Sequence, residues 1–371
     1  MALIAVLGVS VFTYAYTMEQ ATPNEKIRVA VFKGHGGSET CVWEAVAAVG
    51  MDRSLECRTI TTSEIARGDL SEVDVLIVPG GGGSTQYLNM GTSGCDAVKT
   101  FVRNGGGCIG ICAGAYLITE TPGYASLAMS GAEAHDIEHD NRGRGIAKVS
   151  LTEEGKALFP EVASLDTLYI MYYEGPVVLP REGSDIHYTS YATMESDVHV
   201  EGNAPSGMTN GKSFLYISDY GDGKTASVVG HPEATPGMQW MISRLVHKVS
   251  PRKVESDLPE KFIDPHKFDR EILMTDERRT TESDAYDILL YGSEREQLTT
   301  LEWLMTHNSW SAKRWIQGLI FDQNPIVRKA ASEWISWAMY CTYLPDLKVA
   351  YDVEQDPDVK ATLKSSIDAL D

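Results

Sequence analysis

The pattern Gly110-Ile-Cys112-Ala-Gly114 places a cysteine between two glycines, directly after an apolar run. A strand that turns sharply into a helix needs small residues at both glycine positions, and it leaves the middle side chain at the helix N-terminus. The helix dipole and the free backbone N–H groups at that end favour a thiolate. The pattern therefore predicts Cys112 as a nucleophile, in preference to a buried structural cysteine.

A base and a carboxylate stand two residues apart in His231-Pro-Glu233, which follows a second apolar run at residues 225–230. A carboxylate beside an imidazole orients the ring and stabilises its positive charge. If both apolar runs are strands of one sheet, their ends can meet at the same edge. The spacing therefore predicts a catalytic triad of Cys112, His231 and Glu233.

The glycine-rich stretch 79–83 follows a third apolar run and exposes unhindered backbone N–H groups. We expect the amides of Gly81 and Gly82, together with that of Ala113, to form an oxyanion hole. A flexible turn or a phosphate cradle is the alternative for this loop. His35 stands between glycines at the end of the first apolar run and is a candidate pocket residue, although a solvated loop histidine is the alternative.

The six cysteines are too dilute for a disulfide scaffold, and none forms a CxxC pair typical of zinc or redox sites. The cluster His135-Asp-Ile-Glu138-His139-Asp140 contains metal-capable side chains, but an exposed acidic loop is the better interpretation. We therefore expect neither a metal site nor a cofactor.

The elements that must position these residues alternate between short apolar runs and helical stretches. Strands are expected at residues 27–32, 74–78, 108–111 and 225–230, and helices at 39–49, 95–104 and 236–248. Such alternation is typical of a parallel sheet with right-handed crossovers, helices on both faces, and ligands at the carboxyl ends of the strands. The sequence therefore predicts a flavodoxin-like, doubly wound α/β domain over residues 26–250.

The remainder of the chain changes in character. Residues 251–285 are charged and contain proline, which favours a linker, whereas 286–371 are helical and rich in tryptophan. Asn324-Pro325 recurs as Asp356-Pro357, which resembles the helix opening of HEAT-like repeats. An ordinary helical hairpin packed on the main domain is the alternative. These helices are also a candidate surface for a protein partner.

Charge and hydropathy bound the partners and the location. With 32 Lys and Arg against 52 Asp and Glu, the formal charge of -20 repels phosphate backbones, so a nucleic acid partner is not expected.

The apolar run at residues 1–12 suits a signal peptide, within 1–22, better than a membrane span. Secretion or export to the periplasm is expected; a cytoplasmic protein, an uncleaved interfacial anchor or a misassigned start codon are the alternatives. No integral membrane span is expected elsewhere.

The elbow, the glycine-rich loop and His-Pro-Glu together resemble the class I glutamine amidotransferase superfamily. A narrower resemblance, over about residues 26–250, is to the amidotransferase-like N-terminal domain of biotin-protein ligases. It is carried by Val31-Phe-Lys-Gly34-His-Gly36-Gly-Ser38, Val78-Pro-Gly80-Gly-Gly, Gly105-Gly-Gly-Cys-Ile-Gly-Ile-Cys112-Ala-Gly-Ala-Tyr-Leu117, and Arg142-Gly-Arg-Gly145 followed by Leu151-Thr-Glu-Glu-Gly155.

This resemblance implies Cys112 as nucleophile, His231 as base and Glu233 as the orienting carboxylate. It also implies oxyanion donors at Gly81, Gly82 and Ala113. Glutaminase sites of the superfamily have Gln where Tyr116 stands, and no ligase or synthetase domain follows, so glutamine is disfavoured as substrate. Tyr116 is instead a candidate substrate-binding residue.

Two functional hypotheses follow. The first is an amide hydrolase or amidotransferase-like enzyme with a cysteine nucleophile, acting on a small-molecule or peptide amide. The second is a catalytically silent binding or scaffold module, in which the pocket persists and the C-terminal helices dock a partner.

Overall fold

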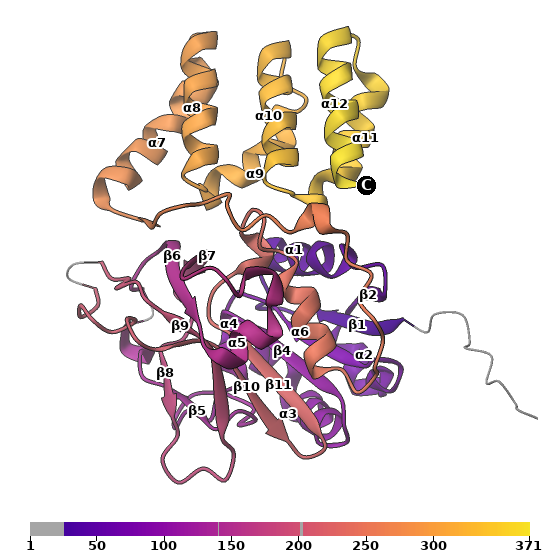
Figure 1. The fold of residues 1–371 in the computed structure, drawn as a ribbon, viewed down its shortest axis with the longest axis vertical. Helices are drawn as coiled ribbons and strands as arrows, with labels where there is room; N and C mark the ends of the chain where they lie inside the picture. Colours follow the sequence, from indigo (N-terminus) through magenta and orange to yellow (C-terminus); the bar gives the residue numbers. More distant parts are fainter. Residues whose placement is uncertain (1–25, 140, 201–202) are drawn as a thin grey trace, which may run out of the picture.

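A computed structural model describes residues 26–139, 141–200 and 203–371 of the chain (Figure 1). The predicted signal peptide at residues 1–22 lies outside the described residues. A large central sheet is covered by helices on both faces, and an array of helices stands over one end of it (Figure 1). None of the helices within the described ranges is long and apolar enough to cross a membrane.

Five neighbouring strands form the parallel core of the sheet. In spatial order they are β2 (Leu55–Ile60), β1 (Ile27–Phe32), β3 (Val75–Val78), β4 (Gly107–Ile111) and β11 (Gly223–Val228). All four strands expected from the sequence are among them, because β-branched apolar runs suit strands that are buried on both faces.

Helices cover both faces of this core. Helices α1 (Glu39–Gly50) and α6 (Met241–Val249) pack on one face, and α2 (Thr62–Arg67), α3 (Gly83–Arg103) and α4 (Ala113–Ile118) on the other. The prediction of a parallel sheet with helices on both faces is therefore correct for this half.

The other half of the sheet is antiparallel, so the prediction of a wholly parallel, doubly wound sheet is wrong there. Five strands extend the sheet beyond β11: β10 (Ser213–Tyr220), β9 (Tyr188–Met194), β6 (Arg144–Leu151), β7 (Leu168–Tyr173) and β12 (Ile272–Leu273). The reversal begins at the two residues between Tyr220 and Gly223, where Gly221 has φ +62°. A two-residue turn with positive φ joins antiparallel strands, and Gly221-Asp222 supplies the glycine that it needs.

The remaining elements of the α/β part are short. A small two-stranded sheet pairs β5 (Ala132–Ala134) with β8 (Val178–Pro180), and α5 is Glu153–Leu158. Single 3-10 turns lie at η1 (Asp69–Glu72), η2 (Ile137–His139), η3 (Pro160–Val162), η4 (Pro232–Ala234), η5 (Glu260–Phe262) and η6 (Cys341–Tyr343).

The C-terminal region is all helical, as expected, and begins earlier than residue 286. Its helices are α7 (Asp276–Tyr291), α8 (Glu294–Thr306), α9 (Trp310–Leu319), α10 (Pro325–Trp337), α11 (Leu344–Val353) and α12 (Pro357–Leu370). The segment 251–285, expected to be a linker, thus contains β12 and the start of α7. Helices α8, α10 and α12 lie side by side (Figure 1).

The weak repeat marks equivalent positions in this array. Pro325 and Pro357 are the first residues of α10 and α12, and the side chains of Asn324 and Asp356 cap the two helices. Pro at the first helical position and Asn or Asp at the cap both favour helix initiation. The repeat therefore specifies two helix starts, while a HEAT-like relationship stays a prediction.

The helical region is docked on the α/β part through buried contacts. Lys313 of α9 forms an ion pair with Glu44 of α1, and both side chains are only 3% exposed. The side-chain amide of Gln239 donates to the carbonyl of Ala338, 2.7 Å away, and the Phe268 and Trp337 rings meet edge to face. These contacts fix the position of the helices over the carboxyl ends of the parallel strands.

Candidate functional site

Cys112 occupies a strained turn between β4 and α4. Its φ of 52° and ψ of -104° lie outside the regions that most side chains adopt. A β-carbon at Gly110 would come within 2.4 Å of the carbonyl oxygen of Gly114, and one at Gly114 within 2.0 Å of that of Val78. The close approach of helix to strand therefore requires both glycines, as the sequence pattern indicated.

His231 and Glu233 follow the adjacent strand β11, which pairs with β4 so that Val228 lies opposite Ile111. The Nδ1 atom of His231 is 2.7 Å from Oε1 of Glu233, and both side chains are buried. The two strand ends therefore carry Cys112 and the His231–Glu233 pair to the same edge of the sheet.

The charge state of His231 reflects its neighbours. Burial lowers the pKa of the ring, but the Cys112 sulfur and the Glu233 carboxylate, which both hydrogen-bond the ring, outweigh burial. Together they raise the pKa of His231 well above its ordinary value. The Cys112 sulfur also donates to the carbonyl of Tyr173, 3.2 Å away. The arrangement therefore favours the protonated form of the His231 ring.

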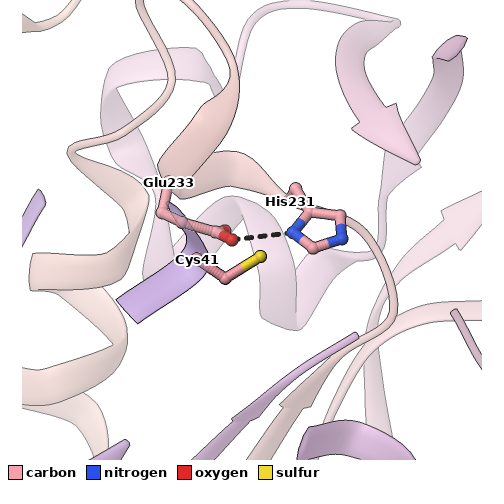
Figure 2. Close-up of side chains that lie close together, drawn as sticks. All are labelled: Cys41, His231 and Glu233. Atoms are coloured by element: carbon pink, nitrogen blue, oxygen red, sulfur yellow. Dashed lines mark hydrogen bonds and ion pairs between the residues drawn. The ribbon is translucent and has the colours of Figure 1, made fainter. Parts of the chain in front are cut away.

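Cys41 is a member of this group that sequence reasoning missed. Its sulfur, a ring nitrogen of His231 and a carboxylate oxygen of Glu233 all lie within 4.8 Å of one another (Figure 2). Burial raises the pKa of the Cys41 thiol to about 12. Cys41 lies in α1 without a recognisable motif, so the only signal in the sequence was its place on the buried face of that helix.

The three expected oxyanion donors differ in their hydrogen bonding. The N–H of Gly82 donates to the carbonyl of Gly36, 2.8 Å away, and is therefore engaged. The N–H groups of Gly81 and Ala113 have no acceptor among the residues that the structure describes. Two of the three backbone amides are thus available to a ligand.

Tyr116 is held in place by a buried ionic network. Its hydroxyl donates to Asp136, and the guanidinium of Arg142 lies 2.5 Å from the same carboxylate. Arg142 is fully buried and also donates to the Tyr172 hydroxyl, 2.6 Å away. Burial, followed by the neighbouring Asp136 carboxylate, raises the pKa of Tyr116 well above its ordinary value. Tyr116 therefore presents a fixed, protonated phenol, and Arg142 has a structural role.

A cavity of about 880 Å³ joins most of the predicted site residues. Its lining includes Gly81, Gly82, Cys112, Ala113, Tyr116 and His231. His35 is not part of the lining; it is exposed, and its backbone N–H donates to the side chain of Asn89.

The C-terminal helices supply a wall of the same cavity that sequence reasoning did not foresee. This wall, called the aromatic wall below, consists of three aromatic residues, Tyr286, Trp310 and Trp315, together with Ser311 and Arg314. The ring centroid of Trp310 is 5.0 Å from that of His231 and 6.1 Å from that of Tyr173, while Tyr286 and Trp315 stack at 4.7 Å. A cavity of this size with aromatic walls and a few polar groups is typical of a small-molecule site.

Comparisons with solved structures give distant likenesses. PurLQS from Thermotoga maritima shares 12% identity at a TM-score of 0.44, covering 60% of this chain and 96% of that one. A ThuA-like protein from Bacteroides uniformis shares 13% identity at a TM-score of 0.42, and the match covers 62% of this chain and 98% of that one. A cytoplasmic protein from Salmonella typhimurium LT2 shares 12% identity at a TM-score of 0.42, and the match covers 60% of this chain and 100% of that one.

Comparisons by sequence concern a shorter stretch. No curated protein matches the chain. Residues 27–128, which include Cys112 and the glycine-rich loop, match the family described as biotin-protein ligase, N terminal. Over this stretch, the match confirms the resemblance expected from the motifs.

Proposed function

We propose that the protein is an amide hydrolase with Cys112 as nucleophile, His231 as acid and base, and Glu233 as the carboxylate that orients His231. The observation that carries the proposal is the chain of contacts from the Cys112 sulfur through the His231 ring to Oε1 of Glu233. The cavity beside Cys112 and the strained turn that holds the sulfur support the same assignment.

The chemistry follows from this arrangement. The Cys112 thiolate attacks the carbonyl carbon of an amide, and the backbone N–H groups of Gly81 and Ala113 stabilise the oxyanion. The tetrahedral adduct collapses as His231 donates a proton to the nitrogen, so that the C–N bond breaks and the amine leaves. Water then attacks the thioester while His231 accepts its proton, which releases a carboxylic acid and regenerates the thiolate. A substrate amine in place of water would make the reaction an amide transfer.

The walls of the cavity bear on the substrate. Tyr116 stands where glutaminase sites of the class I glutamine amidotransferase superfamily, which the motifs resemble, carry Gln. Hydrogen bonds with Asp136 and Arg142 hold its phenol in place. The cavity is also far larger than the side-chain amide of glutamine needs. Both features favour a bulkier small-molecule or peptide amide.

Alkylation of the free thiols tests the nucleophile. At a pH of about 6 to 7, iodoacetamide should label Cys112 ahead of the other cysteines, read by peptide mass spectrometry. Burial raises the pKa of Cys41, Cys57 and Cys108 to about 12 and that of Cys341 to about 11, so these thiols stay protonated.

The dependence on His231 separates the enzyme from a silent binding module. We expect His231→Ala to suppress labelling of Cys112, and His35→Ala, which changes an exposed histidine outside the cavity, to leave it unchanged. Equal labelling of several cysteines, or labelling that ignores His231, would favour the silent module. A panel of amide and thioester probes, with Cys112→Ala as the inactive reference, then identifies the substrate class.

A further inference from the structure

Cys41 lies next to the His231–Glu233 pair, and the proposed reaction does not use it. The sulfur, nitrogen and oxygen atoms of the three side chains lie within 4.8 Å of one another, and all three residues are buried. Figure 2 shows the Cys41 sulfur close to the hydrogen bond that joins Glu233 to His231. Helix α1 supplies Cys41, whereas His231 and Glu233 belong to the turn after β11, at the start of η4 and within it.

Two of the three side chains have unused bonding capacity. Oε2 of Glu233 is buried and has no hydrogen-bond partner within the described ranges. The Cys41 sulfur likewise makes no hydrogen bond to any residue that the structure describes. An uncompensated carboxylate oxygen in the interior is unfavourable and calls for a partner that none of the described residues supplies.

The backbone next to this group carries a glycine, Gly80, where a side chain would not fit. A β-carbon at Gly80 would lie 2.8 Å from Cε1 of His231 and 2.9 Å from the Cys41 sulfur. Any side chain at this position would therefore press on both groups, and glycine leaves them accessible to each other.

We propose that Cys41, His231 and Glu233 form a binding site for a zinc ion. Thiolate, imidazole and carboxylate are the ligands that zinc prefers, at about 2.3, 2.0–2.1 and 2.0–2.2 Å, with water in an open fourth position. Tetrahedral ligands at these lengths stand roughly 3.3–3.8 Å apart, so small side-chain movements suffice to close the group around an ion.

Metal binding and catalysis exclude one another, a consequence that rests on the proposed function. Zinc displaces the thiol proton of Cys41 and the Nδ1 proton that His231 shares with Glu233, and both protons pass to water. The imidazole then can neither be oriented by Glu233 nor carry a proton to and from the leaving group. Zinc is thus an inhibitor of hydrolysis that binds inside the catalytic group.

Titration of the metal-free full-length protein with Zn²⁺ against a chromophoric chelator tests the site. We expect one zinc ion per chain, with affinity reduced at least about tenfold by Cys41→Ser and by Glu233→Gln. Cys57→Ser changes another thiol whose pKa burial raises to about 12, and it should leave the affinity unchanged. Thermal unfolding checks each variant for folding, and zinc should raise the Tm of the wild type but not of Cys41→Ser.

Cobalt(II) identifies the sulfur ligand directly. A thiolate-to-cobalt absorption band should appear in the wild type and in Cys112→Ser, and should vanish in Cys41→Ser. The proposal is overturned if the wild type binds no stoichiometric zinc, or if binding depends on Cys112 while Cys41→Ser retains it. Labelling of Cys112 in metal-free protein is independent of these results, so failure of the zinc site and failure of the hydrolase are distinguishable.

Discussion

The two regions that enclose the cavity contribute to it in different ways. The α/β part supplies Cys112, His231 and the backbone amides, each within a few residues of a strand end. The helical region supplies the aromatic wall from α7 and α9, far along the chain and with no motif around it. The comparison indicates that the reactive groups are placed by local turns, whereas the enclosure of the site depends on how two regions dock.

The docking has a definite centre in the pair of Lys313 and Glu44. The ammonium group of Lys313 also lies 5.2 Å from the ring centroid of Trp310 and 4.2 Å from that of Tyr340. The same residue therefore joins α9 to α1 and packs against the tryptophan that faces His231.

The largest effect is expected from Lys313→Met, which leaves the Glu44 carboxylate buried without its partner. We expect a loss of about 3–5 kcal/mol in the free energy of unfolding, measured by denaturant titration. Because both charges are removed in Lys313→Met/Glu44→Leu, the double variant should regain much of this stability. Lys313→Met with the stability of the wild type would show that the ion pair does not hold the two regions together.

A matched pair of glycine substitutions contrasts the elbow with the helical array. Gly114→Ala should destabilise the protein by about 1–3 kcal/mol and reduce Cys112 labelling, because its β-carbon would overlap the Val78 carbonyl. Gly318→Ala in α9 meets no atom within 4 Å and should stabilise by about 0.5–1 kcal/mol, since alanine favours helix. Melting temperatures of the two variants should move in opposite directions; a Gly114→Ala variant as stable as the wild type would contradict the described elbow.

Trp310→Ala tests whether the helical region shapes the substrate site. Cys112 labelling should persist, because the elbow and His231 remain, while kcat/KM toward the preferred amide probe should fall roughly tenfold, or about 1.4 kcal/mol. Trp303→Ala is the control, since Trp303 stacks on His307 and does not line the cavity. Equal effects of both variants on kcat/KM would show that the aromatic wall does not contact the substrate.

The smallest change concerns a single proton. Glu233→Gln removes one of the groups that raise the pKa of His231, so the pKa should fall, as followed by NMR of the imidazole ring. A raised histidine pKa stabilises the fold below the ordinary value of about 6.5 and loses that effect as pH rises through the folded-state pKa. The advantage of the wild type over the variant should therefore be largest in acid and should shrink as pH rises; an unchanged pKa would argue against the coupling.

Local chemistry explains which parts of the molecule the sequence predicts. The four parallel strands, the glycine requirement of the elbow and the two proline-led helix starts each depend on residues that are neighbours in the chain. The adjacency of β4 and β11 follows from ordinary α/β packing once both runs are recognised as strands. The antiparallel half was missed because strands β6, β7, β9 and β10 were not recognised in the sequence, and neither was the turn at Gly221 that joins β10 to β11.

The amino-acid sequence by itself determined the elbow at Cys112, the pairing of His231 with Glu233 and the helical character of the C-terminal region, because each is encoded in short-range spacing. Only the tertiary structure decided that Cys41 lies beside His231, that the N–H of Gly82 donates to the carbonyl of Gly36, and that Trp310 lines the cavity beside His231. These contacts join residues far apart in the chain. Their formation depends on the packing of whole elements against one another, for which no local spacing carries a signal.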